Sequence, residues 1–243
     1  MRLDKLLADQ GFGTRSEVRK LIARGCASVG GITVRDPSYK VKEDDGVTVF
    51  GKEVEVLSGK TYYYLLLDKP DGMLTAMEDS RLTHVGELIE DRYKNRGVSP
   101  VGRLDYHTTG LLILTNDGEL SHRLTSPSYN IPKTYSVEWA GTPLTDADIR
   151  KASEGITLTD MDKPVKLKPC TITVDGDNSA KIVLTEGKTH EVRRIMAHFG
   201  KEVLSLRRIS IAGLSLNEES APGDLRELTS DEIDSLKQAV RLN

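Results

Sequence analysis

The chain has 243 residues, a formal net charge of −3 and a sequence pI of about 6.0. This balance excludes a chain that is basic throughout, so a surface for nucleic acid would have to be local. The hydrophobic fraction of 37% suffices for packed cores, and the length allows one large domain or a small domain and a medium one.

The cysteines and histidines carry no signature of a metal site. Cys26 and Cys170 are far apart in the chain, and the five histidines show no ligand spacing. Free thiols favour a reducing compartment, no apolar run approaches membrane-spanning length, and the N-terminus lacks the apolar core of a signal peptide. We therefore expect a cytosolic monomer without a metal or a membrane partner.

Residues 1–25 are predicted to form two short helices. Leucines at positions 3, 6 and 7 and apolar residues at 18, 21 and 22 repeat with helical spacing. The stretch 14–17, Thr-Arg-Ser-Glu, matches a capping box that would start the second helix. Seven Lys and Arg stand against three acidic residues between positions 1 and 35. This charge indicates either a solvated helix face or a local surface for RNA.

Short β-type runs follow at 27–29, 32–34 and 47–50. Two helices with basic residues followed by a small sheet resemble the S4 RNA-binding module, and the matching stretches are 2–7, 16–22 and 34–37. One departure is Val29-Gly30-Gly31, where the family usually has an Asn-Gly turn. Such modules bind structured RNA through basic side chains that meet phosphates. The RNA-binding residues that this resemblance implies are Arg2, Lys5, Arg15, Arg19, Lys20 and Arg24.

The remaining chain alternates predicted strands and helices after a plausible linker at 57–60. We predict strands at 62–67, 111–114, 133–139, 170–174 and 181–185, and helices at 85–93, 119–125, 144–155, 190–199 and after Thr229. A second basic stretch lies between positions 187 and 208, with six Lys and Arg against two acidic residues. The glycine spacing of a P-loop occurs at 46–53, but it ends in Glu53 where Ser or Thr must bind magnesium, so no nucleotide cofactor is predicted.

Asp105 is the candidate catalytic carboxylate. It lies in a loop with Arg103, directly before the apolar run 111–114, so it is well placed at a pocket wall as a nucleophile or base. A loop aspartate that caps a turn or pairs with Arg103 fits the same pattern. In a dry pocket the carboxylate would need a cation to stay ionised, and an aromatic ring could stack on a displaced base. Spacing alone does not show that Asp105, Tyr135 and Arg193 converge.

Several motifs in the right order resemble the RsuA-like ribosomal RNA pseudouridine synthases. The first is Gly-Arg-Leu-Asp together with the residues that follow it, at 102–118. The others are Leu-Asp-Lys-Pro-x-Gly at 67–72, Lys-Thr-Tyr at 133–135, and Glu-Gly-Lys-x-His-Glu-Val-Arg-Arg-Ile-Met at 186–196. The resemblance covers nearly the whole chain, S4 module included. It implies an enzyme that detaches a uracil, turns it in the site and rejoins it to the ribose through C5, without cofactor or metal.

The resemblance also implies a role for each residue at the site. Asp105 would act at the ribose, by attack at C1′ or through a glycal, and Tyr135 would stack on the flipped uracil. Arg193 would pair with Asp105, although Arg194 could face the pocket instead. Arg103 would enter the RNA where the base leaves, and Ile182 or Leu184 would line the pocket. Lys188 and Arg194 complete the predicted RNA-binding set.

The implied fold class is α+β: an S4-like module at 1–57 and a synthase domain at 61–243, with a mixed, mostly antiparallel sheet and flanking helices. The stretches 126–128, 162–165 and 221–223 look closest to the branch acting on 16S ribosomal RNA, which makes ribosomal RNA or a small-subunit precursor the expected partner. The 23S-acting branches share the catalytic motifs. A non-catalytic RNA-binding protein of ribosome assembly and a hydrolytic base glycosylase are the rival functions.

Overall fold

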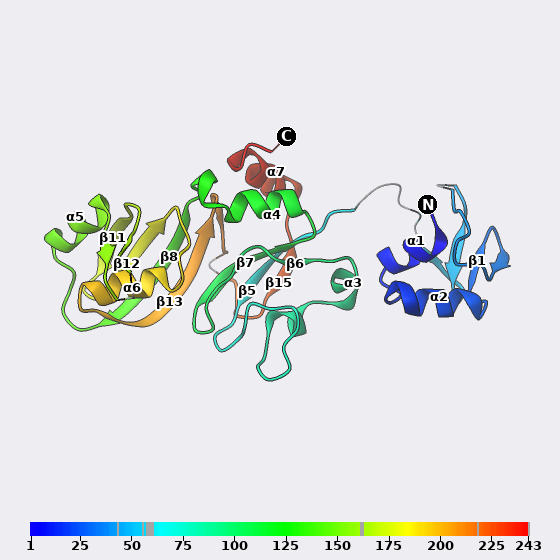
Figure 1. Ribbon diagram of the computed structural model, residues 1–243, viewed down its shortest axis with the longest axis horizontal. Coiled ribbons are helices and arrows are strands. Elements are labelled where there is room, and N and C mark those ends of the chain that lie inside the picture. Colours follow the sequence, from blue (N-terminus) through cyan, green and yellow to red (C-terminus); the bar gives the residue numbers. More distant parts are fainter. Residues whose placement is uncertain (43, 55, 57–60, 161–162, 218, 243) are drawn as a thin grey trace.

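The computed structural model describes residues 1–42, 44–54, 56, 61–160, 163–217 and 219–242. They form a small N-terminal unit and a larger unit built on one long, curved sheet (Figure 1). The expected linker at 57–60 and residue 162 of the stretch 162–165 lie outside the described residues. No helix among the described residues is long and apolar enough to cross a membrane.

The N-terminal unit has the predicted two helices and small sheet. Its elements are α1 (Leu3–Asp9), α2 (Arg15–Ala23), β1 (Ala27–Val29), β2 (Ile32–Val34), β3 (Val47–Val49) and β4 (Lys52–Val54). The strands pair antiparallel in the order β2-β1-β3-β4. Thr14 and Glu17 form the predicted capping box. The third predicted strand ends at Val49, one residue early, because Phe50 has a φ of +51° and turns the chain into β4.

The larger unit contains a nine-stranded sheet in the order β11-β12-β8-β13-β7-β5-β15, with β14 on β13 and β6 on β7 (Figure 1). Its strands are β5 (Tyr64–Lys69), β6 (Ser99–Pro100), β7 (Thr109–Thr115), β8 (Lys133–Ala140), β11 (Thr171–Gly176), β12 (Ser179–Leu184), β13 (Glu202–Ile211), β14 (Leu214–Ser215) and β15 (Leu225–Glu227). A separate pair joins β9 (Thr157–Leu158) to β10 (Val165–Lys166). Only the pair β13–β7 in the described part of this sheet is parallel, so the predicted mixed, mostly antiparallel sheet is confirmed.

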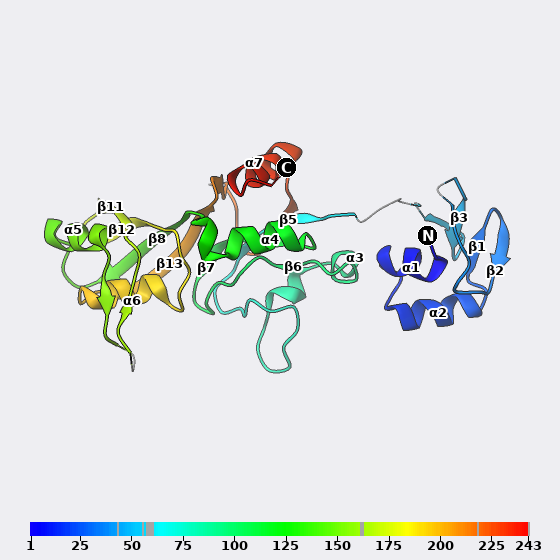
Figure 2. The same cartoon turned by 45° about the horizontal axis from the view of Figure 1, so that its top comes forward.

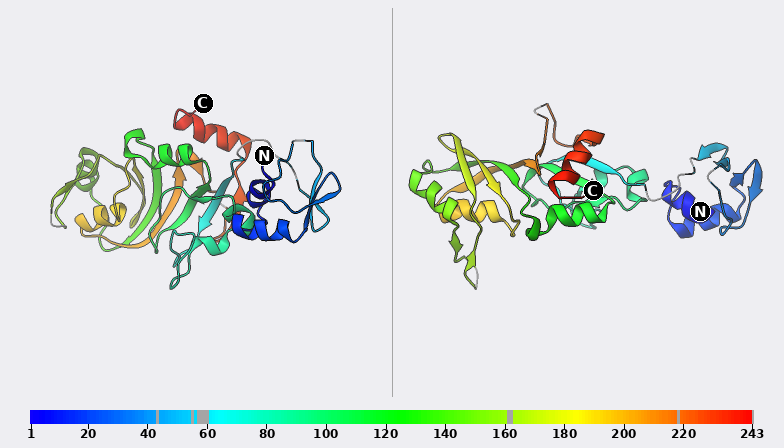
Figure 3. Two further views of the ribbon diagram at one scale, coloured as in Figure 1. Left: turned by 45° about the vertical axis from the view of Figure 1, so that its right-hand side comes forward. Right: turned by 90° about the horizontal axis from the view of Figure 1, so that it is seen from above.

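Helices cover both faces of the sheet (Figures 2 and 3). They are η1 (Val85–Leu88), α3 (Asp91–Lys94), α4 (Gly118–Thr125), η2 (Pro127–Tyr129), α5 (Asp146–Glu154), α6 (Glu191–His198) and α7 (Ser230–Ala239). Strand β7 shows why both faces are covered. Leu111 and Ile113 pack in the same core as side chains of α4 and α7, whereas Leu112 and Leu114 pack with side chains of η1 and α3.

The structure differs from the predicted elements of the larger unit at one helix and one strand in particular. The helix expected at 85–93 is two short helices, because Ile89 is extended and Glu90 starts a new helix. Strand β13, the longest in the sheet, was not predicted. Its side chains do not alternate regularly, with Leu204 67% exposed and Arg208 buried, and its pairing with β8 shifts register between Val203 and Ser205 and between Arg208 and Ser210.

Strands β13 and β7 approach closely where Gly110 lies. Arg207 on β13 forms a bidentate ion pair with the buried Asp68 on β5, although β7 lies between these two strands. A Cβ on Gly110 would meet the Arg207 Cγ at 2.9 Å. Because Gly110 has no side chain, the Arg207 side chain has room to pass over β7 and reach Asp68.

Candidate active site

Asp105 lies on a loop between β6 and β7, and buried contacts fix the loop on its N-terminal side. Leu104 is buried among the side chains below η1. The Thr75 hydroxyl donates to the Leu104 carbonyl oxygen at 2.7 Å and accepts from the Leu104 amide at 3.1 Å. The Asp105 side chain itself is 37% exposed. Its carboxylate is therefore accessible, although the preceding residue, Leu104, is held in place.

Lys69 holds the loop on the other side of Asp105. Its fully buried Nζ donates to the carbonyl oxygens of Pro70, Tyr106 and Thr108 at 3.0, 3.2 and 3.0 Å. Burial lowers the pKa of Lys69 to about 8, and the negative charges of Asp71 and Asp105 oppose that shift. Lys69 therefore joins the end of β5 to the segment that follows Asp105.

Replacing Lys69 by Met should damage both stability and catalysis. Three carbonyl groups, one buried and two partly buried, would lose a charged donor, which we expect to cost about 2–4 kcal/mol of unfolding free energy. The Asp105 loop would also lose its position, with a fall in turnover of at least about 100-fold. Urea unfolding and single-turnover kinetics, both well below the melting temperature, measure the two effects.

Lys201→Met is the matched control for Lys69→Met. Lys201 is also buried, and its Nζ donates to Thr142 Oγ1 and the Pro143 carbonyl, away from the Asp105 loop. This variant should lose stability and keep its turnover. Equal turnover in the two variants would contradict a positioning role for Lys69.

Asp105 stands where three cavities meet. A cavity of about 620 Å³ lies between the loop, α6 and β13 and is lined by Asp105, Arg193, His107 and His190, among others. A small hollow of about 80 Å³ is lined by Asp105, Tyr135 and Leu184. A third cavity, of about 450 Å³, is lined by Asp105, Tyr135, Lys133 and Arg208. A nucleotide that places its ribose at Asp105 thus has room for its base and for the chain on either side.

The small hollow has the composition expected for a base. Tyr135 on β8 supplies an aromatic ring and Leu184 on β12 an apolar wall, whereas Ile182 is buried in the core behind them. Of the two apolar candidates, only Leu184 lines this hollow. A planar ring between a tyrosine and an aliphatic side chain gains stacking and apolar contact at once.

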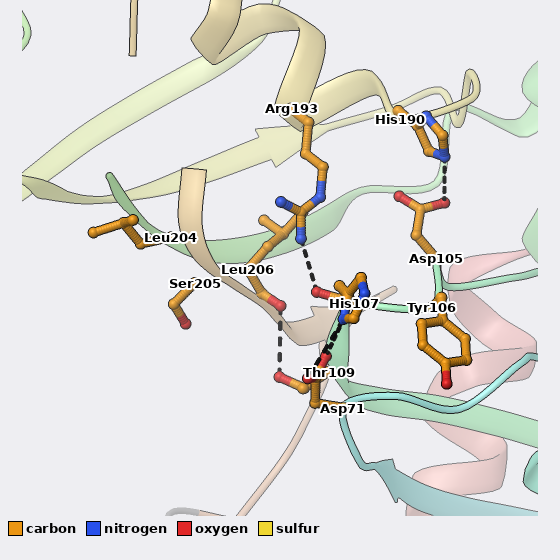
Figure 4. A pocket seen from close by; sticks show the side chains of 10 residues that line it. All are labelled: Asp71, Asp105, Tyr106, His107, Thr109, His190, Arg193, Leu204, Ser205 and Leu206. Carbon is orange, nitrogen blue, oxygen red and sulfur yellow. Dashed lines mark hydrogen bonds and ion pairs between the residues drawn. The ribbon is translucent and has the colours of Figure 1, made fainter. Parts of the chain in front are cut away.

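The predicted ion pair between Arg193 and Asp105 is not formed in this structure. Arg193 donates to the carbonyl oxygens of His107 at 2.8 Å and Val203 at 3.4 Å (Figure 4). The basic side chain within 4 Å of the Asp105 carboxylate, among the described residues, is His190, whose Nε2 lies 3.7 Å away. The cause is local: His190 has a φ of +51° and starts α6, so Arg193 comes one turn later, above the His107 carbonyl.

A carboxyl pair shapes the turn that carries His190. Glu191 accepts from the Lys188 amide at 2.8 Å, and Glu186 accepts from the Lys168 amide at 2.7 Å and pairs with Lys188 Nζ at 3.0 Å. Burial, reinforced by the nearby Glu186 charge, raises the pKa of Glu191 to about 7. The two buried carboxyl groups hold both ends of the turn 186–191.

The predicted RNA-binding arginines of the N-terminal unit gather around one buried acid. Arg2, Arg15 and Arg19 lie 2.9, 3.8 and 3.1 Å from Asp4, whose side chain has no exposed surface. The three arginine side chains remain 46–56% exposed, so Asp4 holds them side by side at the surface. Burial alone would raise the pKa of Asp4, but the hydrogen bonds from Arg2 and Arg19 and the charges of Arg2 and Arg15 together lower it. The other three predicted contacts, Lys5, Lys20 and Arg24, are exposed.

The remaining predicted RNA contacts differ in whether their side chains are paired with an acidic residue. Arg103 is exposed and has no acidic partner within 4 Å in the described part of the chain. Lys188 lines the cavities but is paired with Glu186. Arg194 lines none of the three cavities and forms two hydrogen bonds of 2.7 Å with Asp160, so the alternative in which it faces the pocket is not seen, whereas its RNA contact stays a prediction.

The predicted catalytic and RNA-binding set omitted three side chains that line the cavities: His190, Lys133 and Arg208. Lys133 and His190 stand inside motifs that were recognised, so motif position could have indicated them. The burial of Arg208 had no such signal, because it depends on strand β13, which was not predicted. Among the described residues, no group of three or more His, Cys, Asp or Glu side chains could hold a metal ion.

Comparisons with known proteins identify the family to which the chain belongs. A family model of RNA pseudouridylate synthases matches residues 63–198, and an S4 domain model matches residues 1–47. The chain is 37% identical to an uncharacterized RNA pseudouridine synthase of Bacillus subtilis, over 98% of this chain and 99% of the relative. It is 35% identical to ribosomal small subunit pseudouridine synthase A of Vibrio vulnificus, over 97% and 99%.

Two further matches extend the comparison. Ribosomal large subunit pseudouridine synthase B of Bacillus subtilis is 36% identical over 97% of this chain and 95% of its own length. A crystal structure of a pseudouridylate synthase superposes with a TM-score of 0.66 and 31% identity, covering 97% of this chain and 99% of that chain.

Proposed function

Because this chain belongs to the RsuA-like RNA pseudouridine synthases, isomerases that act on RNA, we propose that it converts one uridine of 16S ribosomal RNA to pseudouridine, with Asp105 as the nucleophile. The substrate is the RNA itself or an assembling small-subunit particle. One observation carries the site assignment: Asp105 is the carboxylate that lines all three cavities, and it shares two of them with Tyr135.

The reaction exchanges one bond to the ribose for another. The bond between uracil N1 and ribose C1′ breaks, the uracil turns within the hollow, and a bond forms between C5 and C1′. The C5 hydrogen leaves as a proton and N1 gains one, so the reaction is balanced without an oxidant or a cofactor. Asp105 acts at the ribose, Tyr135 stacks on the displaced uracil, and Arg103 occupies the gap that the uridine leaves in the RNA.

The small subunit is the proposed source of the RNA. The 35% identity to the Vibrio small-subunit enzyme over nearly the full chain supports it. The second candidate is a uridine of large-subunit RNA, because the Bacillus large-subunit enzyme is 36% identical over a similar span. Incubation of each purified precursor RNA with the protein, followed by mapping of pseudouridine, separates the two targets.

Release of tritium tests the chemistry directly. RNA carrying tritium at uridine C5 should lose it to water on incubation with the protein, and the product should contain pseudouridine and no abasic sugar. Release of free uracil would instead identify a hydrolytic glycosylase. RNA binding without either product would identify a non-catalytic binding protein.

The exposed basic side chains of the N-terminal unit should carry part of the affinity for RNA. Changing Lys5, Lys20 and Arg24 to Gln together should weaken binding and reduce the slope of log K against log salt by about two. These side chains are exposed, so the fold should be unaffected. Filter binding at several salt concentrations measures the slope.

The control triple variant changes Arg150, Lys151 and Lys181, which are exposed on the larger unit, to Gln. Its slope should stay at the wild-type value. Equal slopes in the two triple variants would remove the N-terminal unit from the RNA contact.

A further inference from the structure

Most of the charged side chains that line the cavity of about 450 Å³ beside Asp105 are cations. Arg103, Lys133, Lys188 and Arg208 contribute to its wall, and Asp105 is the one acidic side chain there. Asp105 and Tyr135 also line the small hollow proposed for the base, so the two cavities open onto the same point. One part of the cavity is therefore next to the position proposed for the reacting nucleotide, and its other charged lining residues are the cations Arg103, Lys133, Lys188 and Arg208.

Two of these cations are placed by the sheet itself. Lys133 and Tyr135 alternate by two along β8 and share one face, and Arg208 on β13 is directly opposite Tyr135. Lys133 and Arg208 are therefore on neighbouring strands, with Arg208 opposite the residue two positions after Lys133, and neither lies on a loop. Both are buried, with relative exposures of 9% and 3%.

Neither buried cation has an acidic partner among the described residues. Arg208 donates from Nε to the Leu111 carbonyl at 2.8 Å, and its buried Nη2 has no hydrogen-bond partner. Lys133 Nζ has one long contact, 3.3 Å, to the Ile131 carbonyl. Buried charges are normally paired or fully hydrogen-bonded. Two buried like charges without a counter-ion are therefore a costly arrangement.

The neighbouring acids do not neutralise this pair. Neither Asp105 nor Glu191 forms an ion pair with Lys133 or Arg208: the Asp105 carboxylate lies 3.7 Å from His190 Nε2, and Glu191 accepts from the Lys188 amide and faces Glu186. Burial and the Arg208 charge lower the pKa of Lys133 to about 8, and the Glu191 charge only partly opposes this. An anion in the cavity would stabilise both cations.

We propose that Lys133 and Arg208 form a buried phosphate site, which takes an RNA phosphate attached to the reacting uridine. This inference rests on the proposed function, since it uses RNA as the source of the anion. A phosphate offers several acceptor oxygens, which suits the free guanidinium edge of Arg208 and the point charge of Lys133. The site fixes the backbone beside the ribose, so that C1′ is presented to Asp105.

Nucleotide binding to the full-length protein tests the site without any turnover. The probes are uridine, uridine 5′-phosphate and uridine 3′-phosphate, titrated calorimetrically at pH 7. We expect one monophosphate to bind at least tenfold more tightly than uridine, and that one identifies which phosphate is recognised. Lys133→Met and Arg208→Met should each abolish the gain and leave uridine binding unchanged.

Lys181→Met is the control, because Lys181 is exposed on the neighbouring strand β12 and should keep the wild-type gain. Equal binding of all three probes to the wild type would overturn the proposal. Persistence of the gain in both buried variants would overturn it as well.

A second measurement does not depend on the folding of a variant. In the wild type, an NMR titration of the Lys133 side chain should show a pKa near 8 without ligand and a pKa higher by at least one unit when the tighter monophosphate is saturating. An unchanged Lys133 pKa on saturation would overturn the site.

The tritium assay separates this proposal from the proposed function. A phosphate-dependent gain without tritium release from any RNA would leave the phosphate site standing and remove the function. Tritium release together with equal binding of the three probes would remove only the phosphate site.

Discussion

Replacement of Asp105 by Asn should reduce tritium release from C5-labelled RNA by at least about a thousand-fold. The amide has the size of the carboxylate but carries no charge and is a poor nucleophile at a ribose carbon. Because the loop is held by Thr75 and Lys69 and not by the Asp105 side chain, its position should be kept. RNA binding should therefore stay within a few-fold of wild type in the same buffer.

Asp71→Asn is the matched control for this experiment. Asp71 lines the same large cavity, but its carboxylate is 63% exposed and pairs with His107 at 3.2 Å. Its replacement should leave tritium release close to the wild-type rate. Substantial turnover in the Asp105 variant would refute the assignment of Asp105.

Gly110→Ala should be the most destabilising single substitution that we predict, with a loss above about 4 kcal/mol or no folded protein. The new Cβ would lie 2.3 Å from the Arg208 carbonyl oxygen and 2.9 Å from the Arg207 Cγ. Gly110 also has a φ of +98°, which L side chains rarely adopt. The strands β7 and β13 would have to separate, and the Asp68–Arg207 ion pair would be lost with them.

Gly118→Ala provides the comparison. Gly118 begins α4, has no atom within 4 Å of the position of a new Cβ, and needs no positive φ. This substitution should be neutral or stabilise by about 0.5–1 kcal/mol. Chemical denaturation of both variants measures the difference, and similar midpoints would contradict the close approach of β7 and β13.

Local sequence determined most elements of the fold. The capping box at Thr14 and the apolar run 111–114 fixed a helix start and a central strand, because both act over a few residues. Strand β13 could not be predicted in this way. Strand β13 is buried by β8 and β7, which are distant in the chain. Two arginines in its sequence also interrupt the apolar pattern by which a strand is recognised.

The candidate site divides in the same way. The motifs by themselves identified Asp105, Tyr135 and Arg193, and their catalytic roles stay predictions. Only the tertiary structure decided their partners: His190 and not Arg193 beside Asp105, and Asp160 bound to Arg194. The physical reason is that a motif specifies which groups are present, whereas contacts between a loop, a helix and the strands β8 and β13 depend on how the sheet brings them together. The unpaired Lys133 and Arg208 arise from that same packing.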